Sequence, residues 1–160
     1  MEITKEEIIK GGEFITKQTQ SDEIFTPEDF SEEQKMMRDA VKDFTDKEIW
    51  SKKHEFETHN YQLTADVMKK AGNLGFLGVN VPEEYGGLGM PFTSSMLVCD
   101  YISGSSGSTS TAFGAHTGIG TMPILLYGTD EQKRKYIPKL ATGEHIGAYC
   151  LTEPSAGSDA

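Results

Sequence analysis

The sequence predicts an all-α domain that is followed by the first strand of a β-domain. Up to about residue 143, apolar side chains recur every three or four positions, which is the spacing of amphipathic helices. Two capping-box sequences, SEEQ from Ser31 and TDEQ from Thr129, mark helix starts. After His145 the run IGAYCLT is short, bounded by turn residues and typical of a strand. We therefore expect an irregular arm over residues 1–30, a helical domain over 31–144 and the beginning of a β-domain over 145–160.

The first helix is expected to run from Ser31 to about Trp50. Met37, Val41 and Phe44 follow the capping box at spacings of four and three, so they form one apolar stripe. The residues before Ser31 are polar and are interrupted by two glycines and a proline. At most a short helix is expected there.

Two more helices follow from the same periodicity. One fits residues 64–74, with Val67, Ala71 and Leu74 on one face and a glycine near its end. The other fits Ser94–Ile102, whose apolar side chains are expected to point inward.

The second half of the domain contains a loop, an interrupted helix and a final helix. Asn80–Phe92 holds two prolines and three glycines, which exclude a regular element. The sequences TAFGAHTGIG and TMPILLYG predict a helix that stops or restarts near Thr121, where Pro123 is tolerated in a first turn. The final helix begins after the TDEQ box and is closed by Gly143. Five or six helices are expected in all.

Composition and charge exclude several classes of partner. The net charge of −10 opposes binding to nucleic acid or to an anionic membrane, because both require a cationic surface. The longest apolar stretch, Met122–Tyr127, is too short for a transmembrane helix, which needs ~20 residues. The first residues lack the apolar run of a signal peptide, so we expect a soluble cytoplasmic protein, or a mitochondrial matrix protein in a eukaryote. Cys99 and Cys150 lack metal-ligand spacing and are interpreted as free thiols.

Three features could indicate a catalytic or ligand-binding site, but each has a weak pattern. His116 could act as a general base, yet no acid lies nearby in sequence to orient it, so a packed or solvent-facing histidine is favoured. Ser158 lacks the Gly-x-Ser-x-Gly frame of a nucleophile. Gly86–Gly89, the sequence GGLG, lacks a phosphate-loop pattern and is favoured as a structural loop. No metal site is expected.

The segment TEPSAGSD after the expected strand is a stronger candidate. It offers the hydroxyls of Thr152, Ser155 and Ser158 and the free amides around Ala156 and Gly157. Amides in such a turn can form an anion-binding nest, which suits a pyrophosphate or the polar edge of a heterocycle. On the residues alone, a cofactor site and an ordinary surface turn are equally well supported.

Three segments resemble the acyl-CoA dehydrogenase family, in that family's order. AYCLTEPSAGSD resembles its flavin-binding signature, VPEEYGGLGM its loop between early helices, and GAHTGIGTMPILLYGTDEQKRKYIPKLATGE its helices that lead into the β-domain. The last segment is most similar to the very-long-chain subgroup. The resemblance covers residues 30–160. It implies an N-terminal helical domain, a middle β-barrel-like domain and a C-terminal helical bundle, of which this chain would contain the first domain and the opening strand of the second.

The resemblance also implies the chemistry. Members of the family use FAD to remove the α-proton of an acyl-CoA and to pass the β-hydrogen as hydride to flavin N5, which gives trans-2-enoyl-CoA in fatty acid β-oxidation. The base of that reaction is a glutamate of the C-terminal bundle. We therefore expect no catalytic residue in this chain, interpret Glu153 as structural, and expect the 160-residue chain alone to be inactive.

Site residues follow from the resemblance residue by residue. The side chains expected to line the flavin ring and its edge are those of Tyr149, Cys150, Leu151 and Thr152. Gly157 and Ser158 would meet the pyrophosphate, and Ser158 would also contact the acyl-CoA substrate.

The resemblance further implies electron-transfer flavoprotein as the electron acceptor and a homodimer or homotetramer as the assembly. Alternatives stay open: an acyl-CoA oxidase or flavin monooxygenase of the same fold, or a helical binding module that lost catalysis. The small residues of 112–120, AFGAHTGIG, likewise have two interpretations. They allow close helix packing, or they leave room for a long acyl chain, since the resemblance implies that these helices help wall the acyl tunnel.

Overall fold

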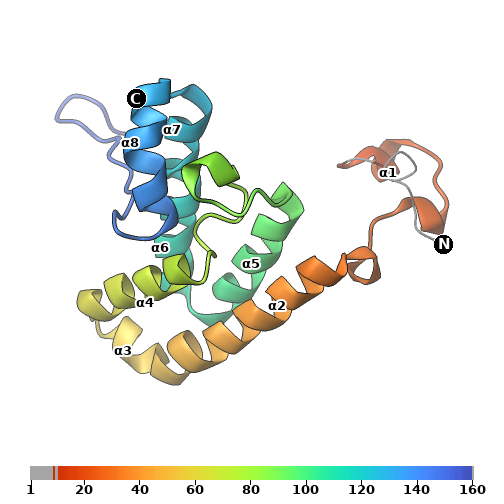
Figure 1. The fold of residues 1–160 in the computed structure, drawn as a ribbon, viewed down its shortest axis with the longest axis horizontal. Helices are drawn as coiled ribbons and strands as arrows, with labels where there is room; N and C mark the ends of the chain where they lie inside the picture. Colours follow the sequence, from red (N-terminus) through yellow and green to blue (C-terminus); the bar gives the residue numbers. More distant parts are fainter. Residues whose placement is uncertain (1–8, 10, 160) are drawn as a thin grey trace. The chain divides into compact units, whose positions relative to one another are not determined.

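The computed structural model describes residue 9 and residues 11–159 (Figure 1). It consists of two compact units, residues 1–36 and residues 37–160. In the described part of the first unit, short helical turns alternate with extended backbone: α1 (Glu13–Thr16), η1 (Ser21–Glu23) and η2 (Pro27–Asp29). Neither α1 nor η2 buries a side chain. These turns are held mainly by local capping contacts, such as the Thr26 amide donating to the Asp29 carboxylate at 2.7 Å.

A long helical run opens the remainder of the fold. It comprises α2 (Glu32–Phe44), the π-helix η3 (Thr45–Ile49), the 3₁₀ turn η4 (Trp50–Lys52) and α3 (Lys53–Glu57) without a break. The predicted capping box is formed, because the Gln34 amide donates to Ser31 Oγ at 3.2 Å and the Ser31 amide donates to Gln34 Oε1 at 3.0 Å. The predicted stripe is confirmed as well, with Val41 and Phe44 buried and Met37 packed against the core.

The next two helices agree with the periodicity except at one residue. α4 (Tyr61–Asn73) is capped by Asn60 and α5 (Phe92–Ser105) buries Leu97, Val98 and Ile102. Leu74 was expected on the buried face of α4, and this was wrong: it is 55% exposed. The helix has ended at this residue, and Gly75 turns the chain at a positive φ of 81°, so Leu74 leaves the helical stripe.

The interrupted helix predicted near Thr121 is confirmed. α6 (Gly107–Gly114) passes into the π-helix η6 (Ala115–Gly120), and α7 (Met122–Tyr127) restarts after one turn residue. α8 (Asp130–Ala141) begins at the predicted TDEQ capping box, in which the Gln132 amide donates to Thr129 Oγ1 at 3.3 Å. From Glu32 onward, apart from the short 3₁₀ turn Glu83–Tyr85, the helical elements form five runs: 32–57, 61–73, 92–105, 107–127 with its interruption at Thr121, and 130–141. This agrees with the expected five or six helices.

Two clusters of buried apolar side chains hold the helices together. The larger includes side chains of α2, η3, α3, α4, α5 and α6, with Val41, Ile49 and Val98 fully buried. The smaller packs α8 against the loop that holds η5 (Glu83–Tyr85), around Tyr85 and Ile137. Among the helices of the described residues, none is both long and apolar enough to cross a bilayer.

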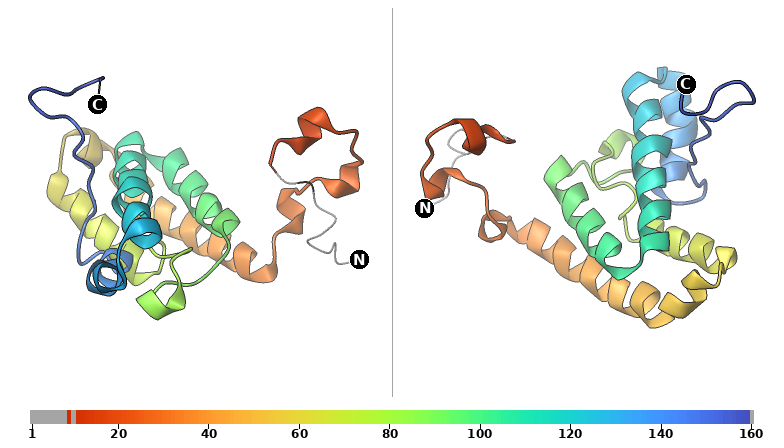
Figure 2. Two further views of the ribbon diagram at one scale, coloured as in Figure 1. Left: turned by 90° about the horizontal axis from the view of Figure 1, so that it is seen from above. Right: turned by 180° about the vertical axis from the view of Figure 1, so that it is seen from behind.

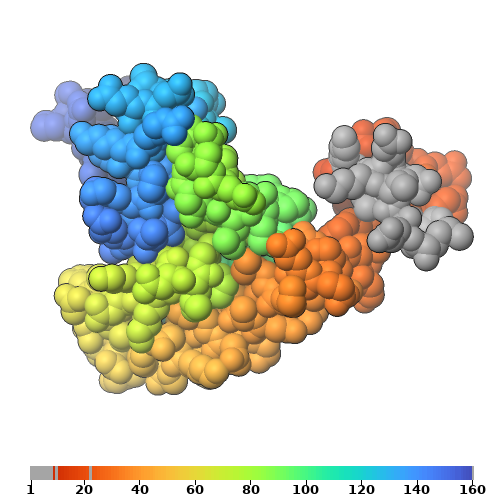
Figure 3. Space-filling model, viewed as in Figure 1, coloured from red at the N-terminus to blue at the C-terminus, as the bar shows by residue number. Residues whose placement is uncertain are grey.

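The strand expected within IGAYCLT is not formed. Residues 146–152 have no regular secondary structure, and the described part of the terminal segment contains only an isolated bridge between Glu153 and Ala156. A strand exists only with a neighbour that accepts and donates its ladder hydrogen bonds, and the residues described here provide no such neighbour. The segment instead projects as a loop beyond α8 (Figure 3).

Candidate functional site

The terminal loop brings the predicted site residues together on one exposed segment. Tyr149 is 57% and Leu151 49% exposed, and Cys150, Thr152 and Ser158 are exposed too. Gly157 has open space where a Cβ would lie, so another molecule can approach its backbone closely. Both cysteines, Cys99 and Cys150, are free thiols, as expected.

The turn at the tip of this loop differs from the expected nest in one respect. The Glu153 amide donates to the Ala156 carbonyl at 2.8 Å, and the Ala156 amide donates to the Glu153 carbonyl at 3.1 Å. The Ala156 amide is therefore not free for an anion, contrary to the expectation, because the turn uses it to close itself. Glu153 contributes backbone groups to this turn, which agrees with its interpretation as a structural residue.

The start of the terminal segment is attached firmly to the helices. The His145 amide donates to the carbonyl of Lys139 at 3.0 Å, and the Gly147 amide donates to Nδ1 of His116 at 2.9 Å. Gly147 also lies directly against Gly120 of η6: a Cβ at position 120 would be 2.8 Å from the Gly147 Cα. Two residues after this attachment, the chain reaches the first expected flavin contact, Tyr149.

His116 is packed, which is one of the two non-catalytic interpretations that the sequence favoured over a general base. The side chain is 0% exposed, and its second ring nitrogen, Nε2, lies 3.0 Å from the Leu140 carbonyl. Since the Gly147 amide is a donor, Nδ1 must accept and Nε2 must carry the proton that it donates to Leu140. Burial lowers the pKa of His116, against the opposing effect of the Leu140 carbonyl. A neutral, fully bonded imidazole inside the protein has no lone pair left for a substrate proton.

The GGLG sequence is a structural loop, as the sequence favoured. Gly86 and Gly89 adopt positive φ angles of 82° and 62°, which favour glycine. A Cβ at Gly87 would lie 2.1 Å from the Val81 carbonyl oxygen, so the backbones are in direct contact. The amide of Gly89 donates to the Val81 carbonyl, and that of Leu88 to the Gly78 carbonyl. Amides that are used in this way do not cradle a phosphate.

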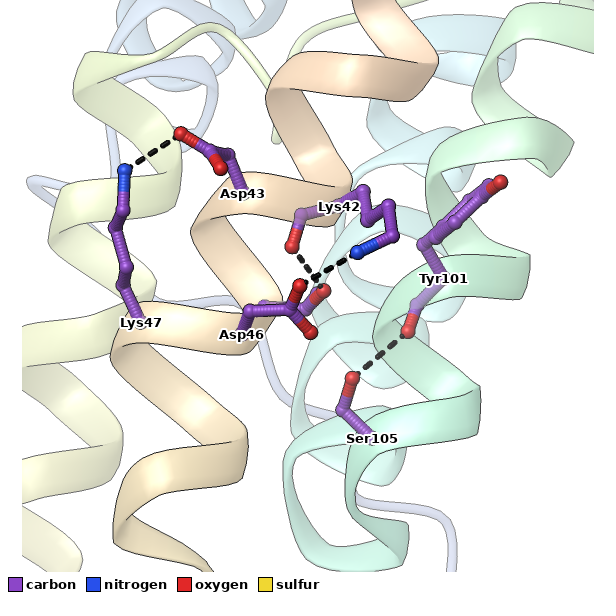
Figure 4. Close-up of polar contacts among 7 residues, drawn as sticks. Lys42, Asp43, Asp46, Lys47, Tyr101 and Ser105 are labelled. Atoms are coloured by element: carbon purple, nitrogen blue, oxygen red, sulfur yellow. Dashed lines mark hydrogen bonds and ion pairs between the residues drawn. The ribbon is translucent and has the colours of Figure 1, made fainter.

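Two open hollows lie on the helical unit, away from the terminal loop. One of about 440 Å³ lies between α5 and the α2–η3 run, where Lys42 pairs with Asp46 at 2.7 Å beside Tyr101 and Ser105 (Figure 4). The Asp46 carboxylate raises the pKa of Lys42, so the lysine keeps its positive charge. The negative charge of Asp46 balances it within the same ion pair. Asp100 also lines this hollow, which makes it unsuited to a phosphate.

The second hollow, of about 300 Å³, is apolar and lies between α7 and α8. Its lining residues are Pro123, Ile124, Tyr127, Gly128, Gln132 and Tyr136. Neither hollow is lined by the terminal loop. Within the described residues, no cluster of histidine, cysteine and carboxylate side chains could hold a metal ion.

Residues 31–144 match the family model described as "Acyl-CoA dehydrogenase, N-terminal domain". The chain belongs to the acyl-CoA dehydrogenase family. A probable acyl-CoA dehydrogenase of Bacillus subtilis is 46% identical over 154 residues, which are 96% of this chain and 26% of that protein. The mitochondrial isovaleryl-CoA dehydrogenase of Solanum tuberosum is 40% identical over 131 residues, 81% of this chain and 32% of its own length.

Solved structures share the fold as well. The acyl-CoA dehydrogenase of Bacillus anthracis, crystallised with FAD, aligns with a TM-score of 0.84 and 46% identity over 94% of this chain and 26% of its own. A chain from the structure described as the electron transferring flavoprotein of Acidaminococcus fermentans aligns with a TM-score of 0.72 and 36% identity, over 81% of this chain and 34% of that one. The chain thus spans about a quarter to a third of the length of these relatives.

Proposed function

We propose that this chain is the N-terminal part of an FAD-dependent acyl-CoA dehydrogenase, which converts an acyl-CoA thioester to trans-2-enoyl-CoA. The main support for the proposal is that the helical domain leads directly into the segment with the predicted flavin-binding residues. The helical domain that matches the family ends in α8, and a firmly attached segment leads from it into the exposed residues Tyr149–Ser158. The relative from Bacillus anthracis, which is similar over nearly the whole chain, was crystallised with FAD.

The terminal loop fits one side of FAD by its chemistry. Tyr149 and Leu151 present large apolar surfaces to solvent, and a flat isoalloxazine ring can cover such surfaces. Thr152 offers an exposed hydroxyl next to them, which can donate to an acceptor on the ring edge. At Gly157 no atom fills the place of a Cβ, so the pyrophosphate can come close to the backbone there, with the Ser158 hydroxyl beside it.

In the proposed reaction FAD supplies the redox chemistry by accepting the β-hydrogen as hydride. The residues of this chain bind the cofactor and orient it toward the substrate. Thr152 fixes the ring edge through its hydroxyl, Tyr149 and Leu151 exclude water from one side of the ring, and Ser158 contacts both the cofactor and the acyl-CoA. Proton abstraction is assigned to a glutamate outside this chain. Glu153 is interpreted as a structural residue, because its backbone closes the turn with Ala156.

The partners belong to the same proposal. We assign electron-transfer flavoprotein as the acceptor, supported by the similarity to the chain from Acidaminococcus fermentans, and a homodimer or homotetramer as the assembly. A cytoplasmic location is favoured by the relatives from Bacillus subtilis.

The test uses the full-length protein that contains this chain. It should purify with bound FAD, and acyl-CoA added without oxygen should bleach the flavin absorbance. Thr152→Val should weaken FAD retention and slow flavin reduction, because it removes a hydrogen bond worth ~0.5–1.5 kcal/mol net while keeping the side-chain shape. Ser155→Ala is the matched control in the same loop and should have little effect. Equal effects of the two substitutions would contradict the proposed orientation of the loop, and a full-length protein without flavin would contradict the function.

A further inference from the structure

His116 connects three parts of the chain that are far apart in sequence. Its ring accepts a hydrogen bond from the Gly147 amide at 2.9 Å and donates one to the Leu140 carbonyl at 3.0 Å. Its own carbonyl accepts from Thr121 Oγ1 at 2.7 Å. One fully buried side chain therefore ties η6 to the end of α8 and to the beginning of the terminal segment. Figure 2 shows this segment passing beside the helices after it leaves α8.

The backbone around His116 is shaped for this contact. η6 is a π-helix, a form that is rare and often found at functional sites. At its end Gly120 meets Gly147 so closely that a Cβ on either residue would lie within 2.9 Å of the other's Cα. A hydrogen bond and a glycine–glycine contact thus hold Gly147 against η6 at two places, which fixes its position and direction.

Beyond Gly147 the segment has no comparable support. In the part of the chain that the structure describes, the hydrogen bonds of residues 148–159 are those of the local turn between Glu153 and Ala156. Gly147 is therefore the last point at which the helical unit holds the segment by a hydrogen bond before Tyr149, Leu151 and Thr152.

We propose that His116 is a positioning residue for the flavin-contacting segment: through Nδ1 it fixes Gly147 and so sets where residues 149–152 meet the cofactor. This inference rests on the proposed function. It goes beyond it by assigning an effect on FAD binding to a buried side chain that does not itself touch the cofactor.

The two ring nitrogens can be tested separately. In His116→Asn the amide oxygen can take the place of Nδ1 and accept from Gly147, but the side chain is too short to reach the Leu140 carbonyl. In His116→Gln the amide nitrogen can take the place of Nε2 and donate to Leu140, while a carbon replaces the acceptor that faces Gly147. Asparagine also leaves the larger cavity, so it should be the less stable of the two variants.

Of the two variants, His116→Gln should therefore be the more stable one and bind FAD more weakly. In the full-length protein, titration of the apoprotein with FAD should give a dissociation constant about tenfold higher for His116→Gln than for wild type, and a smaller increase for His116→Asn. Thermal unfolding of the same apoproteins should rank glutamine above asparagine. Hydrogen exchange in the apoproteins should show the Gly147 amide protected in wild type and His116→Asn, and exposed in His116→Gln.

A third variant separates positioning from general destabilisation. Phe113→Leu makes a cavity in the larger core next to η6. The atoms nearest the Cβ position of Gly147 belong to Gly120 and His116, so the variant should lower the unfolding temperature and leave FAD affinity unchanged. If the affinities of the His116 variants follow their stabilities, or if His116→Gln binds FAD as tightly as wild type, the positioning role is overturned. Wild-type protein that binds no FAD would instead contradict the proposed function.

Discussion

The charge state of His116 is set by what surrounds it. The Gly147 amide points its hydrogen at Nδ1, so a protonated ring would place two donors against each other. No charged side chain is among the causes of the shifted pKa of His116, and α6 and α7, which flank η6, carry no acidic or basic side chain. On α8 and the turn after it, Lys139 and Glu144 pair with each other at 3.1 Å, and His145 is exposed. These neighbours leave burial as the main cause of the lowered pKa of His116.

A specific pH dependence of stability follows from this residue. Because the pKa of His116 is lowered in the folded chain, the unfolded chain binds more protons below about pH 6.5, and the free energy of unfolding falls as the pH decreases through that range. The loss can reach about 1.4 kcal/mol for each pH unit between the two pKa values. Denaturant unfolding at several pH values should show a steeper decline for wild type than for His116→Gln, which cannot titrate. Parallel curves would show that His116 is not buried as a neutral ring.

Two glycines in the same π-helix provide a matched comparison. At Gly120 a new methyl group would meet the Gly147 backbone. At Gly118 no atom beyond the neighbouring residues and the backbone of its own helix lies within 4 Å of the methyl position. Gly120→Ala should lower the free energy of unfolding by ~1–3 kcal/mol through overpacking. Gly118→Ala should raise it by up to ~1 kcal/mol, because alanine is the better helix former. Chemical denaturation of both variants measures the difference, and the same sign for both would contradict the close contact at Gly120.

At the level of elements, local sequence signals predicted most of the helices. Both capping boxes are formed where the sequence placed them, at Ser31 and Thr129. These signals depend on residues three positions apart, so they can be recognised without knowledge of the fold. The errors arose where longer-range partners decide. The strand within IGAYCLT has no neighbour to pair with, and Leu74 leaves its stripe because the helix ends one residue earlier.

The sequence left two interpretations for the small residues of 112–120, close packing and room for an acyl chain. Gly120 is required for the contact with Gly147, so the close-packing interpretation holds there. Gly114 and Gly118 have open space around them, so packing against the described residues does not explain them. At these two positions the acyl-tunnel interpretation remains a prediction.

Gly118→Leu should therefore shift the substrate preference of the full-length enzyme toward shorter acyl chains. Each methylene buried in a tunnel adds ~0.8 kcal/mol to binding, and a leucine at this position would remove the space for several of them. The measurement is kcat/KM over a series of acyl-CoA lengths, for wild type and variant. Gly118→Ala is the control, since it adds a single methyl group. A wild-type optimum at butyryl-CoA, or the same length profile in a folded leucine variant, would contradict this assignment.

At the level of the whole molecule, the sequence could not reveal how the candidate site is attached. His116 contacts Leu140 and Gly147, which are 24 and 31 positions away. No local pattern encodes these pairs, because they arise only when η6, α8 and the terminal segment pack together. A histidine with no acidic neighbour in sequence was the available signal. It indicated a packed or solvent-facing side chain and identified no partner. The candidate site residues were predicted by resemblance, since exposed loop residues carry no periodicity, and they stay predictions.

The 160-residue chain by itself should bind FAD too weakly to retain it, because the candidate site is exposed to solvent. The residues proposed to contact the flavin lie on a single exposed loop, so a bound ring would be covered on one side only and would remain in contact with water. The proposed base is outside the chain, and a positioned proton acceptor typically contributes ~10²–10⁴-fold to the rate. The purified chain should therefore fold as a helical domain by circular dichroism, retain no FAD through gel filtration, and reduce no electron acceptor with palmitoyl-CoA. The full-length protein, assayed in parallel, provides the positive control. FAD-dependent turnover by the purified chain would show that the base lies within these residues, and Glu153 would then be the first carboxylate to substitute.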